Sequence, residues 1–134
     1  MTNNRAILEK ACALDTFAME YETAVYALRA GDYLADFYDT FRVRKNRSCR
    51  LIPHPETTFR DALRELSGES VWLPIAEETE RLFGTPSRVT ALENDGELRE
   101  ELGPRGYAPF FFVFDVMFCE YDAFTLCFFS GTNN

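Results

Sequence analysis

Five positive charges lie close together in the middle of the chain and could bind phosphate groups. They fall within nine residues, at Arg42, Arg44, Lys45, Arg47 and Arg50. Such a cluster is typical of a surface that binds nucleic acid, a nucleotide or an acidic partner. The alternative is a solvated helix end, because cations also favour the negative C-terminus of a helix. We interpret these five residues as candidate partner-binding residues.

Cys49 and His54 stand five residues apart beside this basic run. Nearby arginines lower the pKa of a thiol, and a histidine can act as its general base. The pair is therefore a candidate for a small enzyme with a cysteine nucleophile. The alternative is a structural or exposed histidine, and the spacing along the chain does not decide between the two.

Asp115 is the one charged residue in the most apolar stretch of the chain, from Ala108 to Cys119. Burial raises the pKa of a carboxyl group unless a partner compensates its charge. Such a group can act as a catalytic acid or base, so Asp115 is a second candidate for an enzyme. A structural, hydrogen-bonded aspartate is the alternative. A turn of two to four residues would bring it near Cys127 across a hairpin.

Three glutamates, Glu77, Glu78 and Glu80, lie on a segment in which Pro74 marks the first turn of a helix. Di-iron helical bundles place a histidine three residues after a glutamate, and this sequence has no such pair. It also has no phosphate-binding glycine loop, nucleophile elbow or zinc-protease motif. We therefore predict no cofactor and no metal. The glutamates are interpreted as a solvated helix face or as a partner-binding surface that mimics nucleic-acid phosphates.

Composition narrows the classes of function. The chain has 134 residues and a net charge of −8. The electric field of this negative charge repels duplex nucleic acid and anionic membranes. The four cysteines match no zinc-binding spacing and are predicted to be reduced, with Cys12, Cys119 and Cys127 buried. The N-terminus does not resemble a secretory signal, and the most apolar stretch is too short to span a membrane. These features predict a cytoplasmic protein with no membrane partner.

The N-terminal part of the chain has the spacing of helices. Seven apolar positions, separated alternately by four and three residues, predict a helix over residues 4–30 that Gly31 closes. Asp32 offers the N-cap of a second helix. The remaining expectations up to residue 102 are an extended segment at 51–55, helices at about 56–66 and around Pro74, a helix start at 85–86, and a helix or strand at 87–102.

The C-terminal part is predicted to be β-structure. Residues 110–119 and 123–129 are rich in aromatic and β-branched side chains and flank a turn, which predicts a hairpin within 108–130. Neither strand alternates between apolar and polar residues, so we expect both faces of the hairpin to be covered by other parts of the protein or by a second copy. The predicted fold class is α+β, a single domain over residues 1–134. Its helical region, 4–102, has about four to five helices and packs on the antiparallel hairpin or small sheet. The aromatic hairpin also predicts a homodimer.

The charge segregation and the two-sided hairpin, in a chain without catalytic motifs, favour a non-enzymatic protein-interaction module. It would regulate or inhibit a larger partner, a protein or a protein–nucleic-acid complex. Its size and charge are similar to those of phage or mobile-element inhibitors such as anti-CRISPR proteins that act as acidic DNA mimics. Two alternatives stay open: a nucleic-acid-binding regulator that uses residues 42–50, and a small enzyme that uses Cys49 with His54, or Asp115.

Overall fold

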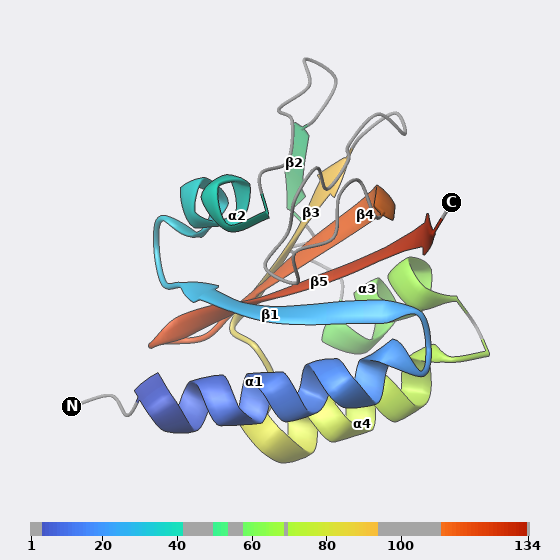
Figure 1. The fold of residues 1–134 in the computed structure, drawn as a ribbon, viewed down its shortest axis with the longest axis horizontal. Helices are drawn as coiled ribbons and strands as arrows, with labels where there is room; N and C mark the ends of the chain where they lie inside the picture. Colours follow the sequence, from blue (N-terminus) through green and yellow to red (C-terminus); the bar gives the residue numbers. More distant parts are fainter. Residues whose placement is uncertain (1–3, 42–49, 54–57, 69, 94–110, 134) are drawn as a thin grey trace.

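The computed structural model describes residues 4–41, 50–53, 58–68, 70–93 and 111–133 (Figure 1). These residues form helices and an antiparallel sheet, which confirms the predicted α+β class. In chain order the elements are α1 (Asn4–Met19), β1 (Thr23–Arg29), α2 (Tyr33–Phe41), β2 (Arg50–Pro53), α3 (Phe59–Ser67), α4 (Trp72–Phe83), β3 (Arg88–Glu93), β4 (Phe111–Glu120) and β5 (Phe124–Asn133).

The sheet has the strand order β1-β5-β4-β3-β2, and all neighbouring strands are antiparallel. The predicted C-terminal hairpin, β4 and β5, is therefore its centre, with β1 on one side and β3 on the other. In the hairpin turn, the Tyr121 N–H donates to the Phe124 carbonyl oxygen at 2.9 Å. Strands at 50–53 and 88–93 complete the sheet, so the region predicted to be helical from 4 to 102 also supplies three of the strands.

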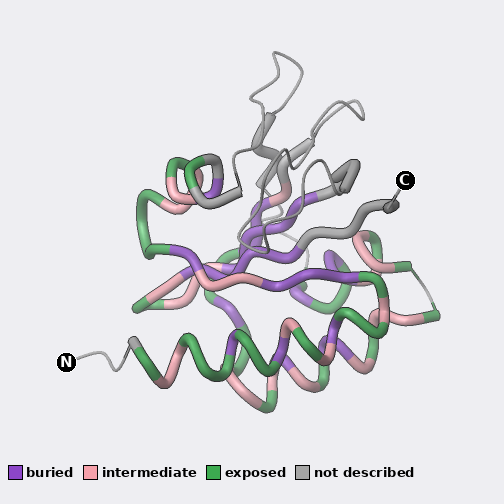
Figure 2. Tube along the Cα trace, viewed as in Figure 1, coloured by how far each residue is buried: buried purple, intermediate pink, exposed green. Residues whose placement is uncertain are grey.

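One face of the sheet, called here the three-helix face, packs against α1, α3 and α4 (Figures 1 and 2). Alternate strand positions point to this face, because successive side chains of a strand lie on opposite sides. The buried residues of this core are Ala11, Leu14, Ala18, Val25, Phe59, Ala62, Leu63, Ile75, Ala76, Val89, Met117, Cys119, Leu126 and Phe128.

The opposite face, called here the α2 face, carries a smaller core. Among the described residues, α2 is the helix that packs on it, through Phe37 with Tyr33 and Leu34 beside it. The Phe118 ring lies 4.8 Å from the Tyr33 ring and 5.4 Å from the Phe37 ring, measured between centroids. The buried residues of this core are Ala24, Leu28, Phe37, Val116, Phe118 and Cys127. At residues 116–119 and 125–128, both faces of the hairpin are thus covered within the chain. The predicted homodimer through the hairpin stays a prediction.

The predicted helix over residues 4–30 is wrong after Met19. A turn follows α1, in which the Tyr21 N–H donates to the Ala18 carbonyl at 2.9 Å and Glu22 adopts a positive φ of 58°. The chain then reverses into β1. The helical spacing misled because residues three apart share a helix face but lie on opposite faces of a strand.

Within β1 the apolar residues face both ways. Val25 belongs to the core of the three-helix face and Leu28 to that of the α2 face. Thr23, Val25 and Tyr26 are also residue types that favour strands. A strand buried on both sides needs apolar residues at nearly every position, so its sequence resembles a helix seam when viewed at intervals of three and four.

The predictions for α3 and α4 are confirmed, apart from a start of α3 at Phe59. The Thr58 hydroxyl accepts a hydrogen bond from the Asp61 N–H at 3.1 Å and caps α3. Gly68 and Gly84 follow the two helices with φ of 91° and 81°, a conformation that favours glycine. The expected helix start at residues 85–86 is wrong, because this segment leads directly into β3.

Candidate functional site

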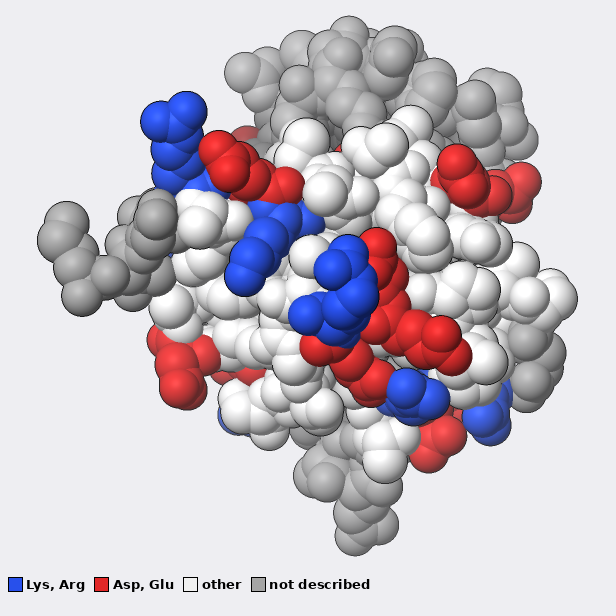
Figure 3. Space-filling model, turned by 90° about the horizontal axis from the view of Figure 1, so that it is seen from below, with Lys and Arg blue, Asp and Glu red and all other residues white. Residues whose placement is uncertain are grey.

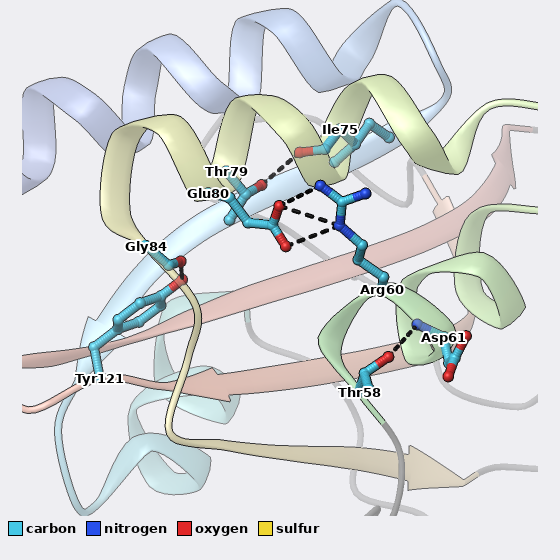
Figure 4. A network of polar contacts seen from close by, with 8 residues as sticks. All are labelled: Thr58, Arg60, Asp61, Ile75, Thr79, Glu80, Gly84 and Tyr121. Carbon is cyan, nitrogen blue, oxygen red and sulfur yellow. Dashed lines mark hydrogen bonds and ion pairs between the residues drawn. The ribbon is translucent and has the colours of Figure 1, made fainter.

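The three predicted glutamates lie on α4, but the structure pairs two of them with arginines. The Arg60 guanidinium, on α3, donates from Nε to both oxygens of Glu80 at 3.1 Å and from Nη2 to Oε1 at 2.6 Å (Figure 4). Hydrogen bonding to Glu80 and the negative charge of Glu80 raise the pKa of Arg60. The contact ties α3 to α4 across 20 positions of sequence.

Glu78 forms a second pair, accepting a hydrogen bond from Nε of Arg81 one turn away. This bond lowers the pKa of Glu78, and the same contact raises the pKa of Arg81. Glu77 is exposed. Figure 3 shows the side of the molecule below α1 and α4, where basic and acidic groups are intermixed. The predicted acidic helix face is therefore largely a set of ion pairs, with less net charge than its glutamates alone would give.

An aromatic site lies beside these pairs, at the start of α4. The Arg64 guanidinium carbon sits 4.5 Å from the centre of the Trp72 ring, a cation–π arrangement. Trp72 is half-buried, and the next residue, Leu73, is 40% exposed. We call this region the α3–α4 surface and define it by Arg60, Arg64, Trp72, Leu73, Glu77 and Glu80.

The glutamates of the α3–α4 surface were predicted from the sequence, but its arginines and its tryptophan were not. Arg60 and Arg64 share one side of α3 because they are four residues apart. Their contacts with α4 depend on how the two helices pack, which no local pattern states. The single Trp of the chain, placed at a helix start, is the signal that could have drawn attention to this region.

The far end of α4 is fixed by the hairpin turn. The Tyr121 hydroxyl donates to the Gly84 carbonyl at 2.8 Å (Figure 4), and the Tyr121 ring stacks on Phe124 at 4.9 Å. Phe83 lies against both rings, 6.0 Å from Tyr121 and 5.1 Å from Phe124. Burial raises the pKa of Tyr121. These contacts anchor α4 to the sheet and hold the α3–α4 surface in one orientation.

The predicted basic run lies almost entirely outside the described residues. Arg42, Arg44, Lys45 and Arg47 fall in this part, as do Cys49 and His54. Arg50 begins β2, where its backbone lies opposite Glu93 of β3. The partner-binding role of the five basic residues and the catalytic role of the Cys49–His54 pair stay predictions.

Asp115 lies in β4, but the expected position near Cys127 is wrong. Asp115 is opposite Ser130, whereas Cys127 is opposite Phe118. The reason is the length of β4, which continues to Glu120 before the turn and so shifts the pairing along β5. The irregularity in register between Val113 and Asp115 lies farther from the turn and does not affect the pairing of Asp115 with Ser130.

The cysteines divide between surface and core. Cys119 and Cys127 are free and buried, as predicted, and burial raises the pKa of both thiols. Cys12 is exposed on α1, so its predicted burial is wrong. It lies one position beyond the buried face that Ala11, Leu14 and Ala18 form.

Neither a metal cluster nor a membrane-spanning helix is found in the part of the chain that the structure describes. Its Asp, Glu, His and Cys side chains form no group of three or more that could hold a metal ion. None of the described helices is long and apolar enough to cross a membrane. No protein-family model, curated protein or solved structure matches this chain.

Proposed function

We propose that the protein is a non-enzymatic interaction module that regulates or inhibits a larger macromolecular partner, and that it binds this partner through the α3–α4 surface. The observation that carries the proposal is the arrangement around Trp72, which is half-buried under the Arg64 guanidinium and next to the exposed Leu73. Tryptophan and arginine are the residue types that dominate binding energy at protein interfaces. An exposed apolar neighbour adds surface that binding would remove from water.

The ion pairs around this aromatic site favour binding because they hold their side chains in place before a partner arrives. Association must otherwise immobilise long side chains, at a cost of about 0.5–1.5 kcal/mol for each. The guanidinium of Arg60 already lies against Glu80 in a two-pronged contact. The rim of the α3–α4 surface is thus preorganised, while Trp72 and Leu73 supply its apolar centre.

The charge of the described residues supports a basic partner. They include eight Lys and Arg and sixteen Asp and Glu, a net charge of −8. A field of this sign steers the protein towards positively charged surfaces and raises the association rate. We therefore propose, more specifically, a partner that handles nucleic acid, as the partners of acidic DNA mimics do. This charge is spread over several elements rather than concentrated on the glutamates of α4.

The free thiols of Cys119 and Cys127 favour a reducing compartment, because oxidising compartments promote disulfides. We accordingly propose the cytoplasm as the place of action. A partner would then be sought among cytoplasmic proteins.

The proposal is tested by affinity capture with matched variants. Immobilised wild-type protein is compared with Leu73→Glu combined with Glu77→Lys, and with the control Leu8→Glu combined with Glu9→Lys, which makes the same two kinds of change at exposed positions of α1. We expect one partner to be retained by the wild type and the control, and lost from the double variant on α4. Equal retention by all three proteins, or no retention by the wild type, would overturn the role of the α3–α4 surface.

The specific proposal of a nucleic-acid-handling partner has its own measurement. The captured partner is purified and titrated into the protein while the fluorescence of Trp72 is followed, with and without duplex DNA. We expect duplex DNA to compete for the partner, and the partner's activity to fall as the complex forms. If duplex DNA does not affect binding of the partner, the proposal of DNA mimicry is wrong, while the proposal of an interaction module stands.

A further inference from the structure

The strand β1 lies at the edge of the sheet, and two aspartate side chains occupy its outward backbone groups. The Val25 N–H donates to Oδ1 of Asp15 at 2.8 Å, and the Arg29 N–H donates to Oδ2 of Asp36 at 2.9 Å. Because Val25 and Arg29 are four residues apart in a strand, their N–H groups point in the same direction, away from β5. These are the groups through which another strand would add to the sheet.

The two carboxylates reach the edge from opposite sides. Asp15 belongs to α1, under the three-helix face, and Asp36 to α2, on the other face. Figure 1 shows β1 with α1 along one side and α2 at its far end. Each helix therefore contributes one acceptor to the same strand. Between the two capped positions lies Ala27, whose backbone has the same outward orientation.

We propose that Asp15 and Asp36 close β1 against strand addition, and that the strand which adds when they are removed is β1 of a second copy of this chain. A charged group over an edge is one of the ways in which proteins avoid edge-to-edge pairing. Here the carboxylates also satisfy the N–H groups directly. The edge is thus a latent interaction surface that the fold holds shut.

A second copy fits this edge for two reasons. Antiparallel pairing of β1 with itself about Tyr26 sets Val25 opposite Ala27 and Thr23 opposite Arg29, so the outward N–H and carbonyl groups of the two copies face one another. The same contact would cover the side of α1 that carries Asp15, since positions four and seven residues away share a helix face. That side exposes Met19 (51%) and Leu8 (59%), which are among the most exposed large apolar side chains described.

The test removes both acceptors, in the variant Asp15→Ala with Asp36→Ala, and measures mass by light scattering. We expect this variant to form a dimer and the wild type to form none through β1. The matched control, Asp15→Asn with Asp36→Asn, keeps an amide oxygen at each position and should behave as the wild type does. Adding Ala27→Pro to the alanine variant removes an outward N–H without affecting pairing to β5, and should restore the monomer.

Two results would overturn the proposal. One is a folded alanine variant that stays monomeric, or whose association survives Ala27→Pro. The other comes from amide hydrogen exchange of the wild type and does not depend on whether the variants fold. The amides of Val25 and Arg29 should exchange at least about tenfold more slowly than that of Ala27. If all three exchange equally fast, the aspartates do not cap the edge.

Discussion

The two faces of the sheet are buried by unequal amounts of chain. The three-helix face has a core of fourteen buried residues under α1, α3 and α4, while the core of the α2 face has six, in the described part of the chain. Burial of apolar area stabilises the folded state in proportion to the area removed from water. We infer that the three-helix face supplies most of the stability and that the α2 face opens at lower free energy.

The largest expected difference between the faces comes from removing one buried ring on each. Phe128 is fully buried on the three-helix face, with its ring centroid 5.8 Å from that of Phe59. Phe128→Ala should lower the free energy of unfolding by about 3–5 kcal/mol, because the surrounding helices cannot close the cavity. Phe37→Ala should cost about 3 kcal/mol, the low end of this range, because α2 can move towards the sheet.

Urea denaturation of the two variants and the wild type measures both values. A matched control is Leu73→Ala, which truncates a partly exposed side chain on α4 and should change stability far less. If Phe37→Ala were as costly as Phe128→Ala, or more so, the two faces would contribute equally and the comparison would fail.

The stability of the protein at alkaline pH tests whether both faces exclude water in the folded state, because each face buries one thiol. Burial raises the pKa of Cys119, on the three-helix face, and of Cys127, on the α2 face, above the ordinary value of 9.0. Above about pH 9 the unfolded chain therefore loses thiol protons that the folded chain keeps. Stability is fully present below this pH and falls above it, by at most about 1.4 kcal/mol per pH unit for each thiol.

Denaturation between pH 9 and 10 should show this fall, and Cys119→Ala and Cys127→Ala should each reduce its slope. The slope rather than the absolute stability is the measurement, because each substitution also leaves a small cavity. A Cys127→Ala variant with the wild-type slope would mean that the α2 face already admits water in the folded state.

Thiol labelling measures the opening of each face directly. In a background with Cys12→Ser and Cys49→Ser, iodoacetamide can react only with Cys119 and Cys127, and mass spectrometry distinguishes the two. Cys127 should be labelled at least about tenfold faster, which corresponds to about 1.4 kcal/mol less for opening the α2 face. Identical rates, equal to the rate of global unfolding, would show that the molecule opens only as a whole.

The sequence predicts an element of either face where the signals for that element are local. The helices α3 and α4 were predicted because their signals are local: the apolar spacing of α3, Pro74 in the first turn of α4, and Gly68 and Gly84 after the two helices. The hairpin was predicted from its aromatic and β-branched content. In contrast, the apolar spacing of β1 predicts a helix, and this prediction is wrong because contacts with β5 and α2, from later parts of the chain, decide its conformation.

The candidate site follows the same rule. The glutamates of α4 were visible in the sequence, but Arg60, which neutralises Glu80, is 20 residues away and reaches it through helix packing. The edge contacts of Asp15 and Asp36 were equally out of reach, because they exist only once β1 is a strand. Local patterns therefore predicted elements, and the contacts between elements determined which charges remain free to bind.

The smallest effect concerns a single cap on the three-helix face. The Thr58 hydroxyl accepts from the Asp61 N–H at the start of α3, a group that otherwise lacks a partner within the helix. Thr58→Ala should lower the free energy of unfolding by about 1 kcal/mol, and Thr58→Ser, which keeps the hydroxyl, by less. Because Arg60 and Arg64 lie in the same short helix, loosening its first turn should also weaken the Arg60–Glu80 contact. Amide exchange of residues 59–64 measures this, and exchange as slow as in the wild type would show that packing alone fixes α3.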